Sequence, residues 1–503
     1  MNGKSWSAVF SFCAALVLLL VSCANPQKAT QTILPSPSAT IAPTSNRPQT
    51  TVVVSEAPKY GGILTQVLTA DIQTFDEAYS TPTGAITLHL TNEELLTGDW
   101  AKGPAGTGQY QWVLTTNRFD SKVGNLAESW ESPEPGHLVF HVRHGVHFAL
   151  SNSDASRLVN GREVTANDVA YSYKRALSDT TGYLWSNIPA VCTSTNITAP
   201  DKYTVDFRMP PLVFPDFASL PDFISTIAPE VIQKYGNMQD WKVHVGSGPF
   251  VITDYIAGSS VTFVRNSQYW GKDPVGPGKG NQLPYLDGVR YLIIPDLSTE
   301  KAAARTAKVD WGGTYTRDDA LDLMNTTNGM VNKKFLSDST MVISMRVDKD
   351  LPYKDLRVRR AMMMATDFNA ITNQLFGGEA DLLGWPLTNQ PELKIAYLPL
   401  SEAPASVQEL WKYNPDKAKQ LLVDAGYPNG FKTKLTVDAR YADDMSIIQS
   451  MWAKVGVNVV IDPKETGVMN TIRARKSQDE LVYSVKPNSR RLHQVHRHRW
   501  HRP

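Results

Sequence analysis

The sequence predicts an α/β protein with more than one domain. Runs of apolar residues that suit strands recur along the chain, between stretches with helical spacing and helix-capping residues. A length of 503 residues suggests about three domains, each able to bury a substantial core. A net charge of +1, without a basic face in the body of the chain, predicts no nucleic-acid partner.

The first residues predict an export signal. Lys4 precedes an apolar run over residues 8–21, which is shorter than the ~20 residues that a membrane-spanning helix needs. The run ends at Ser22-Cys23, which resembles a bacterial lipobox. We therefore expect residues 1–22 to be a lipoprotein signal peptide and Cys23 to be lipidated, with an ordinary signal peptide and a chance cysteine as the alternative.

The segment after the signal has the composition of a tether. Residues 24–57 are rich in Ser, Thr, Pro, Ala and Gln and hold too few large apolar groups to fold, so we expect 23–57 to be a lipidated, disordered tether. Cys13 and Cys23 belong to the signal and the anchor. Only Cys192 then remains, so we expect no internal disulfide, and we interpret Cys192 as a core thiol because no base can be assigned to it.

The folded part begins with a strand in which Ile63, Thr65 and Val67 share one face. A second strand follows over residues 138–142, where Leu, Phe and Val alternate with other residues. Three histidines lie in and after it, which raises the question of a metal site. His144 points away from His141 and His147 on a strand, so the three do not converge and we expect no metal.

A capped helix and a hairpin come next. Thr165 and Asp168 form a capping pair ahead of an apolar stripe at helical spacing. Residues 246–270 read GSGPFVITDYIAGSSVTFVRNSQYW, in which a Gly-rich turn precedes two β-rich runs at 250–256 and 261–265. These residues by themselves predict an antiparallel hairpin and no particular function.

The rest of the chain adds a strand over residues 289–295, apolar enough to be covered on both faces, and a helix over 300–308 capped by Ser298 or Thr299. Asp355 can cap the next helix, in which the methionines at 362–364 are core residues rather than copper ligands or a flexible groove. Pro415 begins another helix, which ends before Gly426. A last helix over 443–454 leads to a strand over 457–461.

Several of these segments together resemble one family. Residues 246–270 resemble the GTGPY…RNPDYW segment of the extracellular solute-binding proteins of peptide ABC importers, the oligopeptide, dipeptide and nickel-binding family (bacterial solute-binding protein family 5). GREVTANDVAYSYKRAL at 161–177 is similar to the family's GRPVTAEDVVYSYERAL. YNPDKAKQLLVDAGYPNG at 413–430 is similar to YDPEKAKKLLAEAGYPDG. The resemblance covers roughly residues 60–465.

The resemblance implies a two-lobed, periplasmic-binding-protein-like α/β fold of the class II type, with discontinuous lobes and mixed sheets. We expect lobe I at 59–312, with an inserted subdomain at about 98–200, and lobe II at 313–483. The basic and His-rich residues 484–503 fit neither lobe. They hold six Lys or Arg, four His and no acidic residue. We interpret them as the result of a truncation or a frameshift, with a basic arm or a His metal tail as alternatives.

The implied function is that of a substrate-binding lipoprotein of an ABC importer, which closes its two lobes on a peptide and delivers it to a membrane permease. A binder of nickel, a nickel chelate or another small solute is the alternative within the family. An exported hydrolase is the alternative outside it, but no catalytic motif of that class occurs, so we expect no enzyme and no cofactor. We expect a monomer, lipid-anchored at the outer face of the cytoplasmic membrane.

The ligand-binding residues are expected by position. Asp71 and Phe75 belong to a loop similar to the family's D-x-x-T-L-D-P, which borders the ligand cleft, with Glu77 in place of the usual Pro; a plain surface turn is the alternative. Gly248 lies in the central turn. Arg346 follows a strand over 342–345, where the family often has Asn, and Trp385 is either a pocket residue or a core residue.

Overall fold

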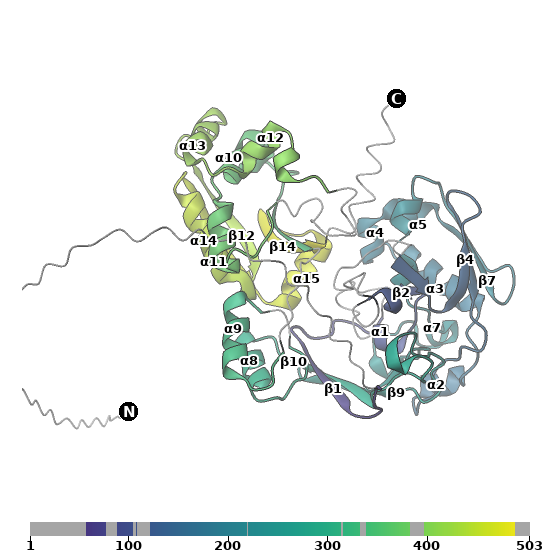
Figure 1. Cartoon of the computed structure of the whole chain (residues 1–503). Helices are drawn as coiled ribbons and strands as arrows, with labels where there is room; N and C mark the ends of the chain where they lie inside the picture. Colours follow the sequence, from purple (N-terminus) through teal and green to yellow (C-terminus); the bar gives the residue numbers. More distant parts are fainter. Residues whose placement is uncertain are drawn as a thin grey trace, which may run out of the picture. The chain divides into compact units, whose positions relative to one another are not determined.

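The computed structural model describes residues 57–76, 88–103, 107, 121–218, 220–312, 315–331, 339–382 and 397–487. Their strands form three four-stranded sheets and one two-stranded sheet. Figure 1 shows these strands with the helices that surround them. The predicted α/β class is confirmed, because two of the large sheets are mixed and carry helices.

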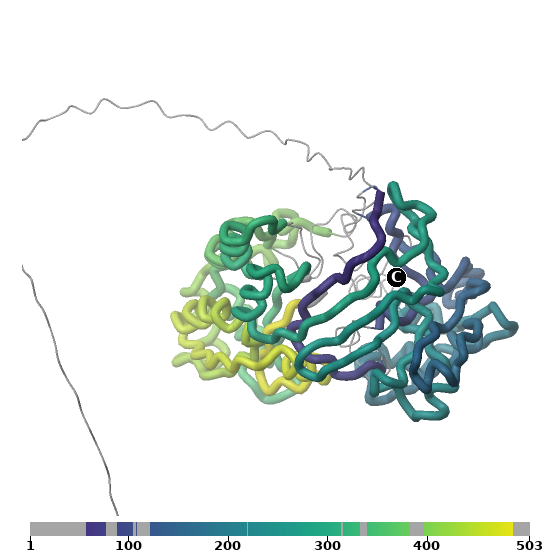
Figure 2. Tube along the Cα trace, turned by 90° about the horizontal axis from the view of Figure 1, so that it is seen from below, coloured from purple at the N-terminus to yellow at the C-terminus, as the bar shows by residue number. Residues whose placement is uncertain are grey.

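The first mixed sheet joins the two ends of a long stretch of sequence. Its order is β1 (Ile63–Leu68), β10 (Gly288–Ile293), β9 (Ser260–Arg265) and β8 (Phe250–Ile256). β1 lies parallel to β10, with Ile63 opposite Gly288, and the other pairs are antiparallel. Figure 2 shows the purple β1 running beside the teal β10. The predicted hairpin is β8–β9, with a register shift between Ile252 and Asp254 that leaves Ile256 exposed.

An antiparallel sheet holds the largest apolar core. It runs β4 (Ala127–Glu131), β5 (His137–Val142), β7 (Thr204–Arg208) and β6 (Asn196–Thr198). Helix α3 (Ala166–Ser178) packs against it through Val169, Tyr173 and Leu177, all at most 4% exposed. The predicted capping box at Thr165 and Asp168 is present. Other helices here are α2 (Asp154–Val159), α4 (Tyr183–Asn187), α5 (Pro189–Ser194), α6 (Phe214–Phe217) and α7 (Pro229–Tyr235).

The second mixed sheet has its own core. Its order is β11 (Ser339–Met345), β14 (Leu481–Pro487), β12 (Phe431–Asp438) and β13 (Val457–Lys464), and the last three are parallel. One face packs on α10 (Leu356–Met364), α13 (Pro415–Asp424) and α14 (Ala442–Ala453). Met362 and Met364 belong to this core, as predicted, whereas Met363 is only partly buried and lies outside it. α11 (Phe368–Phe376), α12 (Ala405–Gln408) and α15 (Thr466–Arg475) complete the region.

The first mixed sheet, which contains β1 and β10, is covered on one of its faces by α8 (Leu297–Arg305) and α9 (Arg317–Thr326). Leu292 and Ile294 pack in this small core, whereas Val289 and Tyr291 pack on the opposite side, so the prediction that this strand is covered on both faces is confirmed. The cap of α8 is Asp296, whose side chain accepts from the Thr299 amide, and not Ser298 or Thr299 themselves. Because Asp296 precedes Ser298 and Thr299 in the chain, capping by its carboxylate makes the helix begin at Leu297, three residues before the predicted start at residue 300.

Three short elements lie close to the residues considered next. They are α1 (Leu88–Thr91) and the paired strands β2 (Leu96–Gly98) and β3 (Lys122–Gly124). None of the helices in the described ranges is long and apolar enough to cross a membrane.

Candidate functional site

The loop after β1 is fixed to the tip of the β8–β9 hairpin. The Asp71 carboxylate accepts from the Tyr255 hydroxyl at 2.9 Å and from the Gly258 amide at 2.7 Å. Phe75 is 3% exposed, and its ring meets that of Tyr255 edge-on at 5.1 Å. The two residues predicted to contact a ligand therefore hold the loop in place, and Phe75 is a core residue of the first sheet.

Gly248 allows the turn before β8 to lie against α1. Its amide donates to the Thr91 carbonyl at 2.9 Å, and its own carbonyl accepts from the Asn266 side chain at 3.0 Å. A Cβ at this position would lie 2.7 Å from the Thr91 carbonyl carbon. The glycine is thus required by a close approach of two backbones.

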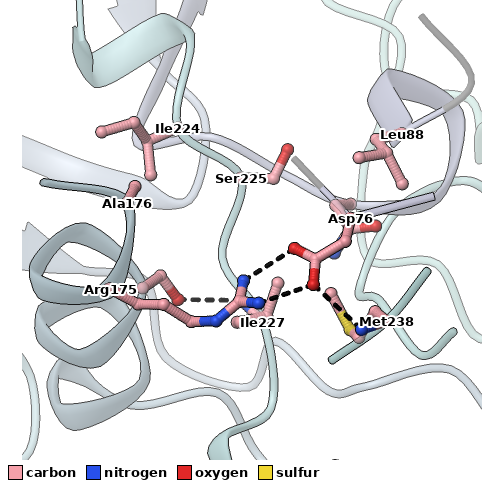
Figure 3. Close-up of a pocket in the computed structure, with 10 residues that line it drawn as sticks. Asp76, Leu88, Arg175, Ala176, Ile224, Ser225, Ile227 and Met238 are labelled. Carbon is pink, nitrogen blue, oxygen red and sulfur yellow. Dashed lines mark hydrogen bonds and ion pairs between the residues drawn. The ribbon is translucent and has the colours of Figure 1, made fainter. Parts of the chain in front are cut away.

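Behind the loop, Asp76 forms a buried ion pair with Arg175 of α3. The carboxylate is fully buried, accepts from both terminal nitrogens of the guanidinium at 2.5 and 2.7 Å, and also accepts from the Met238 amide at 2.9 Å. Figure 3 shows these contacts around a cavity of about 20 Å³. That volume has room for about one water molecule and not for a peptide.

A second buried carboxylate organises the aromatic pair that ends the hairpin motif. Glu93 is 2% exposed and accepts from the Tyr269 hydroxyl at 2.9 Å and the Trp270 indole at 2.6 Å. The Arg143 guanidinium lies over the Trp270 ring, 4.6 Å from its centroid. Burial raises the pKa of Glu93 to about 8. No sequence pattern indicated this group of residues, because Glu93 lies in no recognised motif and its partners are 176 and 177 residues away in the sequence.

The same loop reaches the second mixed sheet through Gln73. Its side-chain amide donates to the Gly467 carbonyl at 3.3 Å and lies 3.5 Å from the Thr471 hydroxyl, both on α15. A further contact joins the end of α15 to α4, where the Lys476 ammonium donates to the Ser186 carbonyl at 3.2 Å. The loop over residues 71–76 is therefore a place where segments with separate apolar cores meet.

Arg346, another predicted ligand-binding residue, lies away from this loop. Arg346 binds Asp348 through its Nε at 2.9 Å and donates to the Gln478 carbonyl at 2.6 Å, so it braces the end of the β11–β14 pair. Its pKa is raised by the hydrogen bond to Asp348. Trp385 and Cys23 lie outside the described residues.

The histidines considered for a metal site, and Cys192, lie among residues that suggest a structural role. Among the described residues, no group of three or more His, Cys, Asp or Glu could hold a metal ion. His144 stacks on Tyr203 with 3.8 Å between the ring centroids. Cys192 is a half-buried free thiol that packs against the largest core, and burial raises its pKa to about 11.

The chain matches the family model of the bacterial extracellular solute-binding proteins, family 5, middle part, over residues 122–485. The chain is 25% identical over 392 residues to a protein of Brucella ovis assigned as an ABC transporter peptide-binding protein, covering 73% of this chain and 67% of that one. It is 26% identical over 367 residues to the glutathione-binding protein of Salmonella typhimurium, covering 71% and 64%.

Solved structures share the fold. The periplasmic binding protein DppA of Helicobacter pylori, in complex with the peptide STSA, has a TM-score of 0.64 and 22% identity over 86% of this chain and 81% of that one. AgaA of A. tumefaciens R10, in complex with agropinic acid, has a TM-score of 0.65 and 23% identity over 85% of this chain and 78% of that one. The fold is therefore the two-lobed α/β fold of periplasmic binding proteins with mixed sheets, as predicted.

Proposed function

Because the chain belongs to family 5 of the bacterial extracellular solute-binding proteins, we propose that it binds peptides and delivers them to an ABC importer. The observation that carries this proposal is the family match over residues 122–485. Two of the similar proteins support a peptide as the solute. One is assigned as a peptide-binding protein and the other is in complex with the peptide STSA.

Binding by closure of two lobes fits the separate cores of the chain. The core around the antiparallel sheet and the core of the second mixed sheet share no residue, so each region can move as a unit. An extended peptide between them would be held by main-chain hydrogen bonds, with its side chains in pockets. Such binding needs no covalent step, and the proposal is of a carrier rather than a hydrolase, acting as a monomer outside the cell.

The ligand is tested by calorimetry and thermal unfolding with the purified protein. Peptides of two to nine residues, glutathione, an opine and a nickel chelate are titrated in turn. We expect a peptide to raise the melting temperature, because a ligand selective for the native state stabilises it by about 2.7 kcal/mol at 100 times its Kd. A shift with the opine or the chelate and none with any peptide would overturn the peptide assignment, and release of cleaved peptide would favour a hydrolase.

We also propose that Cys23 carries the membrane anchor. The support is the apolar run over residues 8–21 that ends at Ser22-Cys23 and the Ser- and Thr-rich segment after it. Growth of the cells with an alkyne fatty acid should label the protein and not its Cys23→Ser variant, which should leave the membrane fraction. Equal labelling of both forms would show that the anchor is elsewhere or absent.

A further inference from the structure

The chain enters the described fold at one end of the first mixed sheet. Pro58 packs against the loop between β9 and β10, where a Cβ at Gly278 would lie 2.8 Å from the proline ring. The Tyr60 hydroxyl donates to the Gln282 carbonyl of the same loop at 2.7 Å, and the Tyr60 ring centroid lies 5.0 Å from that of Tyr285. The residues that lead toward the N-terminus are therefore held at a fixed place on the surface.

Three exposed lysines surround this place. Lys59 lies between the two residues that contact the loop. Lys272 is the antiparallel bridge partner of Gln282 across the loop, and Lys279 directly follows Gly278. None of the three lysines forms an ion pair or a side-chain hydrogen bond with the described residues.

The carboxylates of the loop do not neutralise these lysines, because both have partners within the fold. Asp273 accepts from the Tyr285 hydroxyl at 2.6 Å. Asp287 pairs with Arg265 and accepts from the Gly62 amide at 3.1 Å. This end of the sheet therefore carries a local excess of positive charge.

Exposed apolar side chains lie at the same end of the sheet. Ile63 of β1 is opposite Gly288 of β10, which is opposite Val264 of β9, so the two apolar residues share a face with no side chain between them. Ile63 is 60%, Val264 42% and Tyr60 51% exposed. Helices α8 and α9 pack farther along the strands, around Val67, and leave this end open.

Each of these features is ordinary by itself. Lysines are usually solvated, and single exposed apolar residues are common on soluble proteins. Other exposed lysines of the chain do pair with carboxylates, as Lys202 does with Glu163 and Lys417 with Glu409. Solvation alone does not explain why unpaired lysines and exposed apolar side chains gather where the chain leaves the fold toward Cys23.

We propose that this end of the first mixed sheet lies on the membrane and binds the headgroups of anionic lipids. Lysine ammonium groups are attracted to an anionic lipid surface, and tyrosine and aliphatic side chains are favourable in its headgroup layer. The inference goes beyond the proposed transport function and uses the proposed anchor at Cys23. The membrane-contact surface is defined by Lys59, Tyr60, Ile63, Val264, Lys272 and Lys279.

The length of the chain before Pro58 fits this arrangement. Residues 24–57 link Cys23 to Pro58, and a chain of that length reaches at most about 120 Å when fully extended. An anchor at Cys23 therefore keeps the folded part near the bilayer, which raises the effective concentration of lipid around it. Attraction between exposed charges acts over about 10 Å at 0.1 M salt, so three lysines suffice to orient a protein that the anchor already holds nearby.

The surface is tested apart from the anchor, with the Cys23→Ser protein that lacks residues 1–22. Flotation at millimolar lipid and low salt compares vesicles of phosphatidylglycerol and phosphatidylcholine with vesicles of phosphatidylcholine alone. The wild-type surface should bind the anionic vesicles more strongly. Lys59→Gln/Lys272→Gln/Lys279→Gln should lower the partition coefficient on them about a hundredfold, because each lysine near such a surface contributes about fivefold.

A matched control removes three exposed lysines that also form no ion pair with the described residues but lie on other parts of the chain. Lys174→Gln/Lys419→Gln/Lys454→Gln changes the net charge equally and should lower the partition coefficient less than threefold. Equal losses in the two triple variants would show a general effect of charge and overturn the membrane-contact surface. Equal binding of the wild-type surface to both kinds of vesicle, or no loss in Lys59→Gln/Lys272→Gln/Lys279→Gln, would also overturn it.

A protein partner would give a different result. If the Lys59→Gln/Lys272→Gln/Lys279→Gln variant keeps vesicle binding but loses self-association in ultracentrifugation, or loses retention by vesicles that hold the permease, the surface belongs to a protein and the lipid assignment is wrong. Failure of the other proposals would be seen separately. Fatty-acid labelling decides the anchor at Cys23, and calorimetry with peptides, in which this variant should match the wild type, decides the solute.

Discussion

At the scale of single residues, two buried titratable groups give the molecule opposite responses to pH. Burial raises the pKa of Glu93 to about 8 and lowers the pKa of His244 to about 4. Both residues lie next to α1: Glu93 follows it in the chain, and the His244 ring is 3.4 Å from the hydroxyl of Thr91, the last residue of that helix. Glu93 binds a proton in the folded state up to about pH 8, whereas in the unfolded chain it releases the proton near pH 4.5. His244 stays neutral when folded and charges near pH 6.5 when unfolded.

We predict that the free energy of unfolding falls as pH rises from about 6.5 to 8. In that window Glu93, unlike His244, binds more protons in the folded state, and one such group contributes a slope of up to about 1.4 kcal/mol per pH unit. Between about 4.5 and 6.5, His244 contributes a slope of the opposite sign, so the two offset each other. Urea unfolding at half-unit steps of pH measures the profile.

Glu93→Gln should remove the fall above pH 6.5, because the amide cannot titrate. Glu128→Gln, at an exposed glutamate of β4, is the matched control and should keep the fall. If Glu93→Gln and the wild type show parallel profiles between pH 6.5 and 8, Glu93 is ionised in the folded protein and the assignment of its proton is wrong.

At the scale of elements, the loop over residues 71–76 is fixed by three elements that are distant in sequence. Asp71 holds the β8–β9 hairpin, Asp76 holds α3, and Gln73 reaches α15. Asp71 and Asp76 are both polar residues of one short loop, yet Asp71 is exposed and Asp76 is fully buried. Their substitution should therefore have very different effects.

We predict that Asp76→Ala lowers the free energy of unfolding by about 3–5 kcal/mol, the typical effect of removing one partner of a buried ion pair. The Arg175 side chain is 15% exposed and would lose the carboxylate that binds both of its terminal nitrogens. Asp71→Ala is the control and should cost clearly less. Chemical denaturation with both variants measures the difference, and equal losses would mean that the Asp76–Arg175 pair is not the main anchor of the loop.

Local elements could be predicted from the sequence where the signal lies within a few residues. Asp355 and the Thr165–Asp168 pair cap helices at the predicted positions, and Pro415 begins α13 as predicted, because these signals depend only on the next three residues. The cap of α8 was misplaced, since Asp296, Ser298 and Thr299 are all good caps and their competition is decided by geometry. No strand was predicted after residue 461, but the structure has β14, whose pairing with β11 continues to Pro487 despite the loss of apolar character.

The candidate site was harder to predict than the elements. Phe75 and Gly248 were chosen because of their place in family-like motifs, but their contacts are those of packing: a ring in a core and a turn against α1. Glu93 belongs to no sequence motif. Its significance depends on its burial and on Tyr269 and Trp270, partners 176 and 177 residues away that only the folded chain brings together.

At the scale of the whole molecule, the first mixed sheet pairs β1 with β10, with Ile63 opposite Gly288. No local pattern predicts such a pairing, because the sequence of an apolar strand does not specify which of several similar strands it will lie beside in the folded protein. The resemblance of several segments to one family supplied this level of organisation, and the comparisons confirm the fold.

Polar contacts that join the second mixed sheet's region to the rest of the described structure include Gln73 with α15, Lys476 with the Ser186 carbonyl, and the buried ion pair between Arg440 and Glu300. We predict that Gln73→Ala/Lys476→Ala shifts the unliganded protein toward a more open form, because it removes two of the exposed contacts that join these regions and leaves the Arg440–Glu300 ion pair. Exposed hydrogen bonds are individually weak, so we expect a shift of roughly tenfold in the open-to-closed ratio and a matching rise in the ligand Kd.

Small-angle X-ray scattering distinguishes this change from a loss of fold. The radius of gyration of the variant should exceed that of the wild type without ligand and equal it at saturation, since on the proposed mechanism bound ligand closes both. The control Gln239→Ala/Lys419→Ala removes an exposed Gln and an exposed Lys that form no side-chain hydrogen bond with the described residues, and it should change neither quantity. If the double variant keeps the wild-type radius and Kd, these contacts do not hold the two regions together, and closure depends on the ligand alone.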